Sequence, residues 1–183
     1  MRLSTLARDS RERVLAAAEG EPGRQGCALI YLYDLVQNKL INKISFFRHG
    51  VQSMAFSNCG KFLVAASVAE EGSMVILDVQ QGTIVENGTV MLRELSVNKI
   101  VVNPSSDCQV DIDFLTVGNR GSFAIWQYDH KTQRIMQIIP DMNNDLQHTD
   151  FTCATFTPKL AAPYNGEVVM LGTADGCVVA MNP

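Results

Sequence analysis

The sequence has few cysteines, and they stand far apart. The five form no Cys-x-x-Cys pair, so the sequence predicts neither a disulfide framework nor a zinc site. Cys153 and Cys177 lie in strand-like runs and are expected to be buried, whereas Cys59 lies in a turn and is expected to be exposed. The longest apolar run, residues 62–69, is far shorter than the roughly 20 residues of a membrane-spanning helix. We therefore expect no membrane span.

Positive charge is also scarce. Fifteen Lys and Arg against 19 Asp and Glu give a net charge of −4. A nucleic-acid-binding domain normally carries a basic patch or stripe, so we expect no nucleic-acid partner. The first 13 residues carry six charged side chains and no apolar segment, which argues against a signal peptide and predicts a cytoplasmic protein.

Helical periodicity is missing throughout. Turn residues recur about every 8 to 12 positions, and the runs between them are rich in β-branched and aromatic residues, a pattern typical of antiparallel strands. Residues 51–56, 62–68 and 74–77 are three such runs in succession. With 46% hydrophobic and 19% charged residues, the composition is that of a globular protein. The sequence therefore predicts an all-β fold.

One motif recurs four times along the chain. It starts at residues 28, 72, 121 and 176, at intervals of 44, 49 and 55 residues. A shift of 48 residues also places residues 3–7 on 51–55, and 14–18 on 62–66, without a gap. Each copy ends in an apolar or aromatic residue followed by a polar one: Tyr33-Asp34, Leu77-Asp78, Trp126-Gln127 and Met181-Asn182. Self-similarity at such a period indicates a repeat architecture.

The motif resembles the WD-type propeller repeat, in which a histidine, an inner strand, a tight turn and an aromatic–Asp pair recur about every 40 to 45 residues. The resemblance implies one partial β-propeller over residues 1–183, with about four blades at 2–47, 49–91, 96–139 and 148–183, the last lacking its outer strand. A β-sandwich would lack the correspondence between repeats. Because an unfinished blade exposes sheet edges, we expect a fragment of a larger propeller, completed by further blades of the same or another chain.

The resemblance also assigns structural roles. In WD repeats a histidine before the inner strand, a turn aspartate, a Ser or Thr of the second strand and a Trp of the third form a buried hydrogen-bonded set. The matching positions here are His49, Ser67, Trp126, His148, Thr173 and Asp175, with Met181 in place of the fourth tryptophan. We therefore interpret both histidines as blade fasteners rather than ligands or catalysts. His130 is expected to be a solvated turn residue.

Catalytic signatures are absent from the sequence. There is no phosphate-binding loop, nucleophile elbow or metal-spaced cluster. Asp111 and Asp113 alternate along a strand, a pattern more often found at a solvated turn than in a catalytic pair. The expected inner strands are mostly apolar, whereas a propeller enzyme needs polar residues around its channel. We therefore expect a protein that is not an enzyme and that binds no cofactor or metal. The alternative is a propeller-type hydrolase or lactonase.

The long Glu/Gly/Pro loop at residues 19–26 and the stretch 119–126 resemble the propellers of cilia- and flagella-associated and centriolar WD-repeat proteins. This implies a protein-interaction scaffold with tubulin or axonemal proteins as partners, in a cilium, flagellum or the cytoskeleton. A structural fragment that only completes another propeller is the alternative.

In a propeller, the loops after the second strands share one face with the loops between blades. We expect that face to be acidic and to bind a basic partner segment, and the opposite face to be mildly basic and to meet an anionic surface such as tubulin. The candidate partner-binding residues are Glu19, Glu21, Arg24, Glu70, Glu71, Asn119, Arg120, Asp141 and Asp145. A solvated surface of mixed charge is the alternative interpretation.

Overall fold

The structure is a computed structural model that describes residues 3–21, 26–107, 111–140, 146–157 and 168–181. Within these ranges the chain forms fifteen β-strands and no α-helix, and hence no helix that could cross a membrane. The all-β prediction is confirmed.

The strands form four antiparallel sheets, each a meander in sequence order, which we call blades 1 to 4. Blade 1 contains β1 (Leu3–Arg8), β2 (Val14–Glu19), β3 (Leu29–Asp34) and β4 (Lys39–Ser45). Blade 2 contains β5 (Val51–Phe56), β6 (Phe62–Ser67), β7 (Ser73–Asp78) and β8 (Thr83–Met91). Blade 3 contains β9 (Lys99–Val102), β10 (Asp111–Val117), β11 (Phe123–Asp129) and β12 (Arg134–Ile138). Blade 4 contains β13 (Phe151–Phe156), β14 (Val169–Thr173) and β15 (Val178–Met181), with no outer strand among the described residues.

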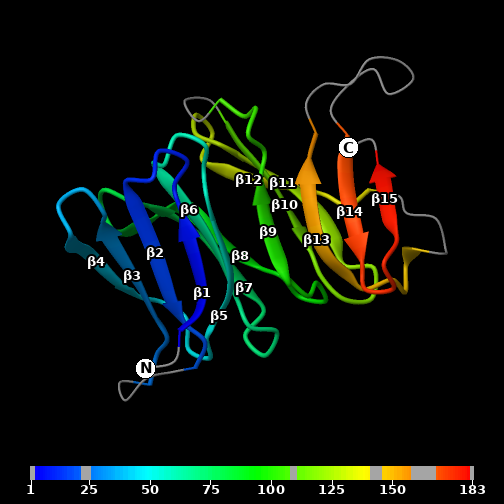
Figure 1. The fold of residues 1–183 in the computed structure, drawn as a ribbon, viewed down its shortest axis with the longest axis horizontal. Coiled ribbons are helices and arrows are strands. Elements are labelled where there is room, and N and C mark those ends of the chain that lie inside the picture. Colours follow the sequence, from blue (N-terminus) through cyan, green and yellow to red (C-terminus); the bar gives the residue numbers. More distant parts are fainter. Residues whose placement is uncertain (1–2, 22–25, 108–110, 141–145, 158–167, 182–183) are drawn as a thin grey trace.

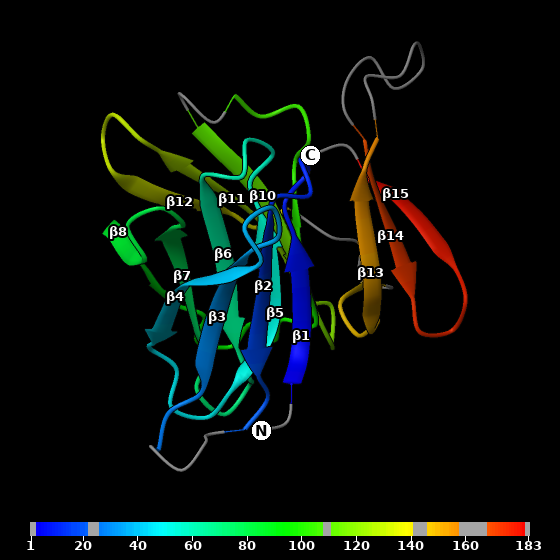
Figure 2. The same ribbon diagram turned by 60° about the vertical axis from the view of Figure 1, so that its left-hand side comes forward.

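The blades stand side by side in an arc, with the first strand of each blade on the inside (Figures 1 and 2). The inner strands β1, β5, β9 and β13 contact one another in that order. The arrangement is a partial WD-type β-propeller, as the repeats predict, and each sheet lies within one of the four expected ranges.

Apolar side chains fill the space between neighbouring blades. Between blades 1 and 2 the core includes Ala16, Ala18, Ile30, Leu32, Met54, Leu63 and Leu77. Between blades 2 and 3 it includes Phe62, Ile76, Phe114 and Trp126, and between blades 3 and 4 Leu115, Phe123, Phe151 and Leu171. All residues of β6 and β7 are buried, because blade 2 has a neighbour on both faces.

Polar side chains also join the blades. The Ser4 hydroxyl donates to the Val51 carbonyl at 2.7 Å, across the boundary between blades 1 and 2. Ser53 accepts a buried hydrogen bond of 3.0 Å from the backbone N–H of Ile100, between blades 2 and 3. The Asn98 amide donates to the Phe151 carbonyl at 3.3 Å, between blades 3 and 4. Each boundary between blades is therefore closed by at least one directional contact as well as by apolar packing.

In blades 1, 2 and 3 an aspartate at the end of the third strand caps the turn that follows. Asp78 accepts backbone N–H bonds of 2.9 Å from both Gln80 and Gln81, and Asp34 acts in the same way in blade 1. In blade 3 this role belongs to Asp129 rather than to Gln127, the residue that the repeat motif places there. The motif fails by two residues because β11 has one residue more than β7 and also starts one residue later, two positions after Gly121 rather than directly after the glycine as β7 does after Gly72.

The sequence predictions of burial are wrong for four residues. Cys153 and Cys177 are exposed rather than buried, because no described sheet covers the outward face of blade 4 and Cys177 lies in a loop. Cys59 is half-buried rather than exposed. His130 is half-buried rather than solvated, because its ring packs on two aromatic rings, with centres 4.6 Å from that of Phe62 and 5.0 Å from that of Tyr128.

The Ser53 hydroxyl gives a direct test of the contact between blades 2 and 3. Ser53→Ala leaves the buried N–H of Ile100 without this acceptor, so we expect the free energy of unfolding to fall by about 1–3 kcal/mol. Ser45→Ala, at an exposed position of β4, is the control and should change it by less than about 0.5 kcal/mol. Urea denaturation measures both, and equal effects would contradict the assignment.

Candidate functional site

The face at which the inner strands begin, which we call the proximal face, lies at the lower side of Figure 1. It is formed by the loops that join second to third strands and by the loops between blades. The opposite, distal face carries the turns after the inner strands and after the third strands. The antiparallel meander fixes this division, so loops far apart in sequence come together on one face.

Glu19, a predicted partner-binding residue, is instead buried and only 4% exposed. Its carboxylate accepts hydrogen bonds of 3.1 Å from the backbone N–H of Leu29 and from the hydroxyl of Tyr31. Partial burial, followed by the contact with Glu19, raises the pKa of Tyr31 above its ordinary value. Glu19 therefore anchors the loop that follows β2. The sequence prediction is wrong because the chain folds back over this side chain.

The last residue of the second strand has the same anchoring role in two other blades. Ser67 accepts a 2.8 Å hydrogen bond from the backbone N–H of Ser73. Thr173 accepts one of 2.9 Å from the backbone N–H of Cys177 and donates its hydroxyl proton to Asp175. In blades 2 and 4 these contacts close the loop or turn that follows the strand.

Blade 3 achieves the same closure without a side chain at this position. Gly118, directly after β10, is the counterpart of Thr173, because its N–H bonds to the Ser122 carbonyl as that of Thr173 bonds to the Cys177 carbonyl. A Cβ atom at Gly118 would clash with the Ser96 carbonyl oxygen. Ser96, from the loop before blade 3, accepts a 2.7 Å hydrogen bond from the Asn119 N–H, and its carbonyl accepts one of 2.7 Å from the Ser122 hydroxyl. Ser96 thus replaces the missing anchor, a role that sequence comparison of the repeats does not reveal.

The histidines do not occupy a buried hydrogen-bonded set. His49 and His148 are both exposed. The Glu71 carboxylate accepts the backbone N–H groups of Arg48 and His49 at 2.8 and 3.0 Å, so it performs the fastening that the resemblance assigns to the His49 ring. Glu71, predicted to bind a partner, is therefore committed to the fold.

Trp126 does make an internal hydrogen bond. Its indole N–H donates to the Thr116 hydroxyl at 2.9 Å, between the third and second strands of blade 3, and both side chains are buried. Thr116 has no role in the sequence predictions, although the resemblance to WD repeats implies a Ser or Thr of the second strand as the partner of this tryptophan.

Several predicted partner-binding residues remain on the surface of the proximal face. Glu21, Glu70, Asn119 and Arg120 are exposed, whereas Arg24, Asp141 and Asp145 lie outside the described residues. The exposed or half-buried acidic residues on this face are Glu21, Glu70, Glu71, Glu94, Asp150 and Asp175. The basic ones are Arg48, Arg93, Arg120 and, at the start of β9, Lys99. Over the described residues the proximal face is acidic, as the charges of its loops predict.

A shallow hollow of about 270 Å³ lies on this face at the start of blade 4. His148, Asp150 and Asp175 contribute to its lining. The Thr173 hydroxyl, with backbone N–H donors, lowers the pKa of Asp175, so this carboxylate stays ionised well into the acidic range. No group of three or more His, Cys, Asp or Glu in the described ranges could hold a metal ion.

A second hollow, of about 320 Å³, opens on the distal face between blades 1 and 2. Arg11, Arg13 and Lys61 contribute to its lining, and all three are exposed. The carboxylate in the lining, Asp9, is only 5% exposed and accepts the backbone N–H groups of Arg13 and Val14 at 2.6 and 2.8 Å. The cations therefore face outward while the acid faces the turn, which makes this hollow positive.

Solved structures share this fold at low sequence identity. The β-propeller domain of Cps50 (Swd1) from Myceliophteria thermophila matches 98% of this chain with a TM-score of 0.70 and 14% identity. A chain of the mitotic checkpoint complex matches 97% with a TM-score of 0.69 and 12% identity, and U3-55K matches 96% with 0.61 and 16%. The present chain spans 51%, 48% and 44% of those three chains, or about half of each. No protein-family model and no curated protein matches the sequence.

The Thr173–Asp175 contact should make the stability of the folded chain depend on pH. Because the pKa of Asp175 is lower in the folded chain than the ordinary 3.8, the contact stabilises the fold fully at pH values well above 3.8 and loses its effect as the pH falls through the lowered pKa. Thr173→Val should move that pKa upward towards its ordinary value. Carboxyl NMR titration measures the shift. Asp129, whose pKa is lowered by Thr132 and nearby N–H groups, is the internal control and should not move.

Proposed function

We propose that this chain is a non-enzymatic protein-interaction scaffold that works in the cytoplasm, in a ciliary or other microtubule-associated assembly. The observation that carries the proposal is the positive hollow on the distal face, where Arg11, Arg13 and Lys61 surround a space of about 320 Å³. Cations grouped around a concave surface favour anionic partners and speed their association. The acidic surface of tubulin fits that requirement.

The opposite face supports a second set of contacts. Glu70 and Arg120 are exposed on proximal loops whose backbones are tied down by Glu71 and Ser96. Rigid loops lose little conformational entropy when they bind a partner. The acidic balance of this face suits a basic segment of another protein, so the scaffold would join an anionic surface on one side to a basic partner on the other.

A second candidate role is completion of a larger propeller. In blade 2, which lies between two blades, every residue of β6 and β7 is buried, but in blade 4 burial alternates along β14 and β15. One face of blade 4 is therefore uncovered among the described residues, and it exposes Cys153 and Val178, the latter by 67%. The span of about half of each solved propeller chain is consistent with further blades covering this face.

Microtubule co-sedimentation tests the scaffold proposal. We expect Arg13→Gln with Lys61→Gln to weaken retention on microtubules by about tenfold, because two of the three cations of the hollow are lost. Lys39→Gln removes an exposed distal cation that does not line the hollow, and Glu70→Lys changes the proximal face, so both should keep full retention. Failure of the wild-type chain to co-sediment, or equal loss in Lys39→Gln, would contradict the proposal.

Alkylation of cysteines tests whether further blades cover the exposed face of blade 4. The Cys153 thiol lies over Gly172 on the uncovered face of blade 4, whereas Cys177 lies in an exposed loop. In the isolated chain we expect iodoacetamide to modify both. In the assembly purified from its natural source, Cys153 should be protected while Cys177 stays reactive, as peptide mass spectrometry would show. Equal reactivity of Cys153 in both samples would rule out a covering blade.

A further inference from the structure

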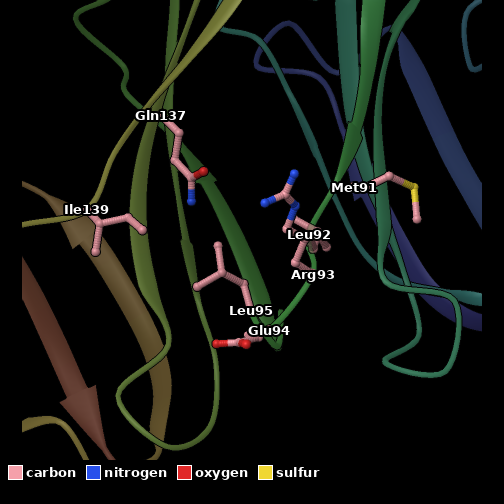
Figure 3. A pocket seen from close by; sticks show the side chains of 7 residues that line it. All are labelled: Met91, Leu92, Arg93, Glu94, Leu95, Gln137 and Ile139. Atoms are coloured by element: carbon pink, nitrogen blue, oxygen red, sulfur yellow. The ribbon is translucent and has the colours of Figure 1, made fainter.

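A groove of about 570 Å³ opens at the outer rim of the molecule, between blades 2 and 3 (Figure 3). One wall is the end of β8 and the turn after it, residues 91–95. The other wall is formed by Gln137 of β12 and by Ile139 just beyond this strand. Because side chains two residues apart on a strand point to the same side, Gln137 and Ile139 both face blade 2. The groove is separate from the two hollows described above.

Apolar and polar side chains share the lining of the groove. Leu92 is only 3% exposed and Leu95 is half-buried, and both belong to or pack on the core between blades 2 and 3. At the rim, Ile139 is 62% exposed, whereas the Met91 side chain points away from the groove (Figure 3). Large apolar side chains gathered around a concave surface mark interaction sites rather than ordinary solvated surface. The groove therefore offers a place for an apolar side chain of a partner.

Arg93 adds a cation to this apolar surface. It lies in the left-handed region at φ 50°, in a turn closed by a 2.9 Å hydrogen bond from the Leu95 N–H to the Leu92 carbonyl. A 2.7 Å hydrogen bond from the Leu92 N–H to Gly72 ties the turn to blade 2. This conformation is uncommon for a residue with a side chain, and here it fixes the direction in which the turn runs, as it does at five other non-glycine residues of the described chain. The turn holds the Arg93 side chain beside the groove.

The Arg93 guanidinium is available to a ligand. It forms no ion pair with any described residue and is exposed. In Figure 3 it extends to the same side as the Gln137 amide, whereas the Glu94 carboxylate lies at the other end of the turn. Two groups that can donate hydrogen bonds thus stand beside an apolar floor. A carboxylate next to an apolar side chain would satisfy both features at once, because guanidinium binds carboxylates with two parallel hydrogen bonds.

We propose that this groove binds a short segment of a partner protein in which an acidic residue lies close to an aliphatic one. The aliphatic side chain contacts Leu92, Leu95 and Ile139, while the carboxylate accepts hydrogen bonds from Arg93 and Gln137. The groove has the size of a small-ligand site, which suits a few side chains rather than a folded domain. β12 is also the edge strand of blade 3, so an extended segment can lie along it.

Peptide pools of defined composition test this inference on the 183-residue chain. One pool of short peptides has an Asp-x-Leu centre, a second has Lys-x-Leu and a third Asp-x-Ser. We expect the immobilised chain to retain the Asp-x-Leu pool at least about fivefold better than either of the others. Arg93→Gln should remove the preference for Asp over Lys, and Ile139→Asp should remove the preference for Leu over Ser.

Arg120→Gln is the matched control, because Arg120 is also an exposed arginine in the left-handed region, at φ 54°, but lies outside the groove. It should keep both preferences, and circular dichroism should show that all variants are folded. Equal retention of the three pools by the wild-type chain would overturn the proposal, as would equal losses in Arg93→Gln and Arg120→Gln. A groove-dependent dimer in analytical ultracentrifugation, without any peptide preference, would identify a second copy as the occupant and also overturn it.

Discussion

Each sheet of this protein is held by apolar contact with the sheets beside it, and this face-to-face packing is the constraint on which the rest of the structure depends. Blade 2 shows the full effect, because β6 and β7 are buried along their entire length. A strand covered on both faces must be apolar at successive positions, which explains runs such as Phe62–Ser67. The loops are then the parts of the chain that remain free to vary in sequence.

The loops vary in sequence, yet local hydrogen bonds keep them in place. Three different side chains, Glu19, Ser67 and Thr173, end their second strands and accept a backbone N–H from the following loop or strand. A carboxylate and two hydroxyl groups perform the same task because the task requires only a hydrogen-bond acceptor at the right place. Surfaces of different charge can therefore be built on one framework without loss of order.

The sequence predicted the strands and the four repeats because those signals are local. Alternating turns and β-branched runs depend on neighbouring residues, and the self-match at 48 residues compares such local runs with one another. Burial could not be predicted in the same way. Cys153 stands in an apolar strand but is exposed, since its environment depends on whether another sheet covers blade 4.

The functional surfaces were the least predictable part. Glu19 looked like a surface residue of a long loop, and only the folded chain shows the Leu29 N–H and the Tyr31 hydroxyl around it. His49 looked like a fastener, but Glu71 is near enough to take its place. The rim groove joins residues 91–95 with Gln137 and Ile139, and the repeat period aligns positions of neighbouring blades without telling which side chains enclose a groove.

Ser96 gives the groove and the proximal face a physical connection. It follows directly after the groove turn at residues 92–95, and its hydroxyl and carbonyl groups hold Asn119 and Ser122 in the next loop. Gly118 lets the two backbones approach so closely that there is little room for one to slide past the other. Ser96 therefore holds the groove turn next to the loop that presents Arg120, so a substitution of this one serine would disturb the packing beneath both surfaces.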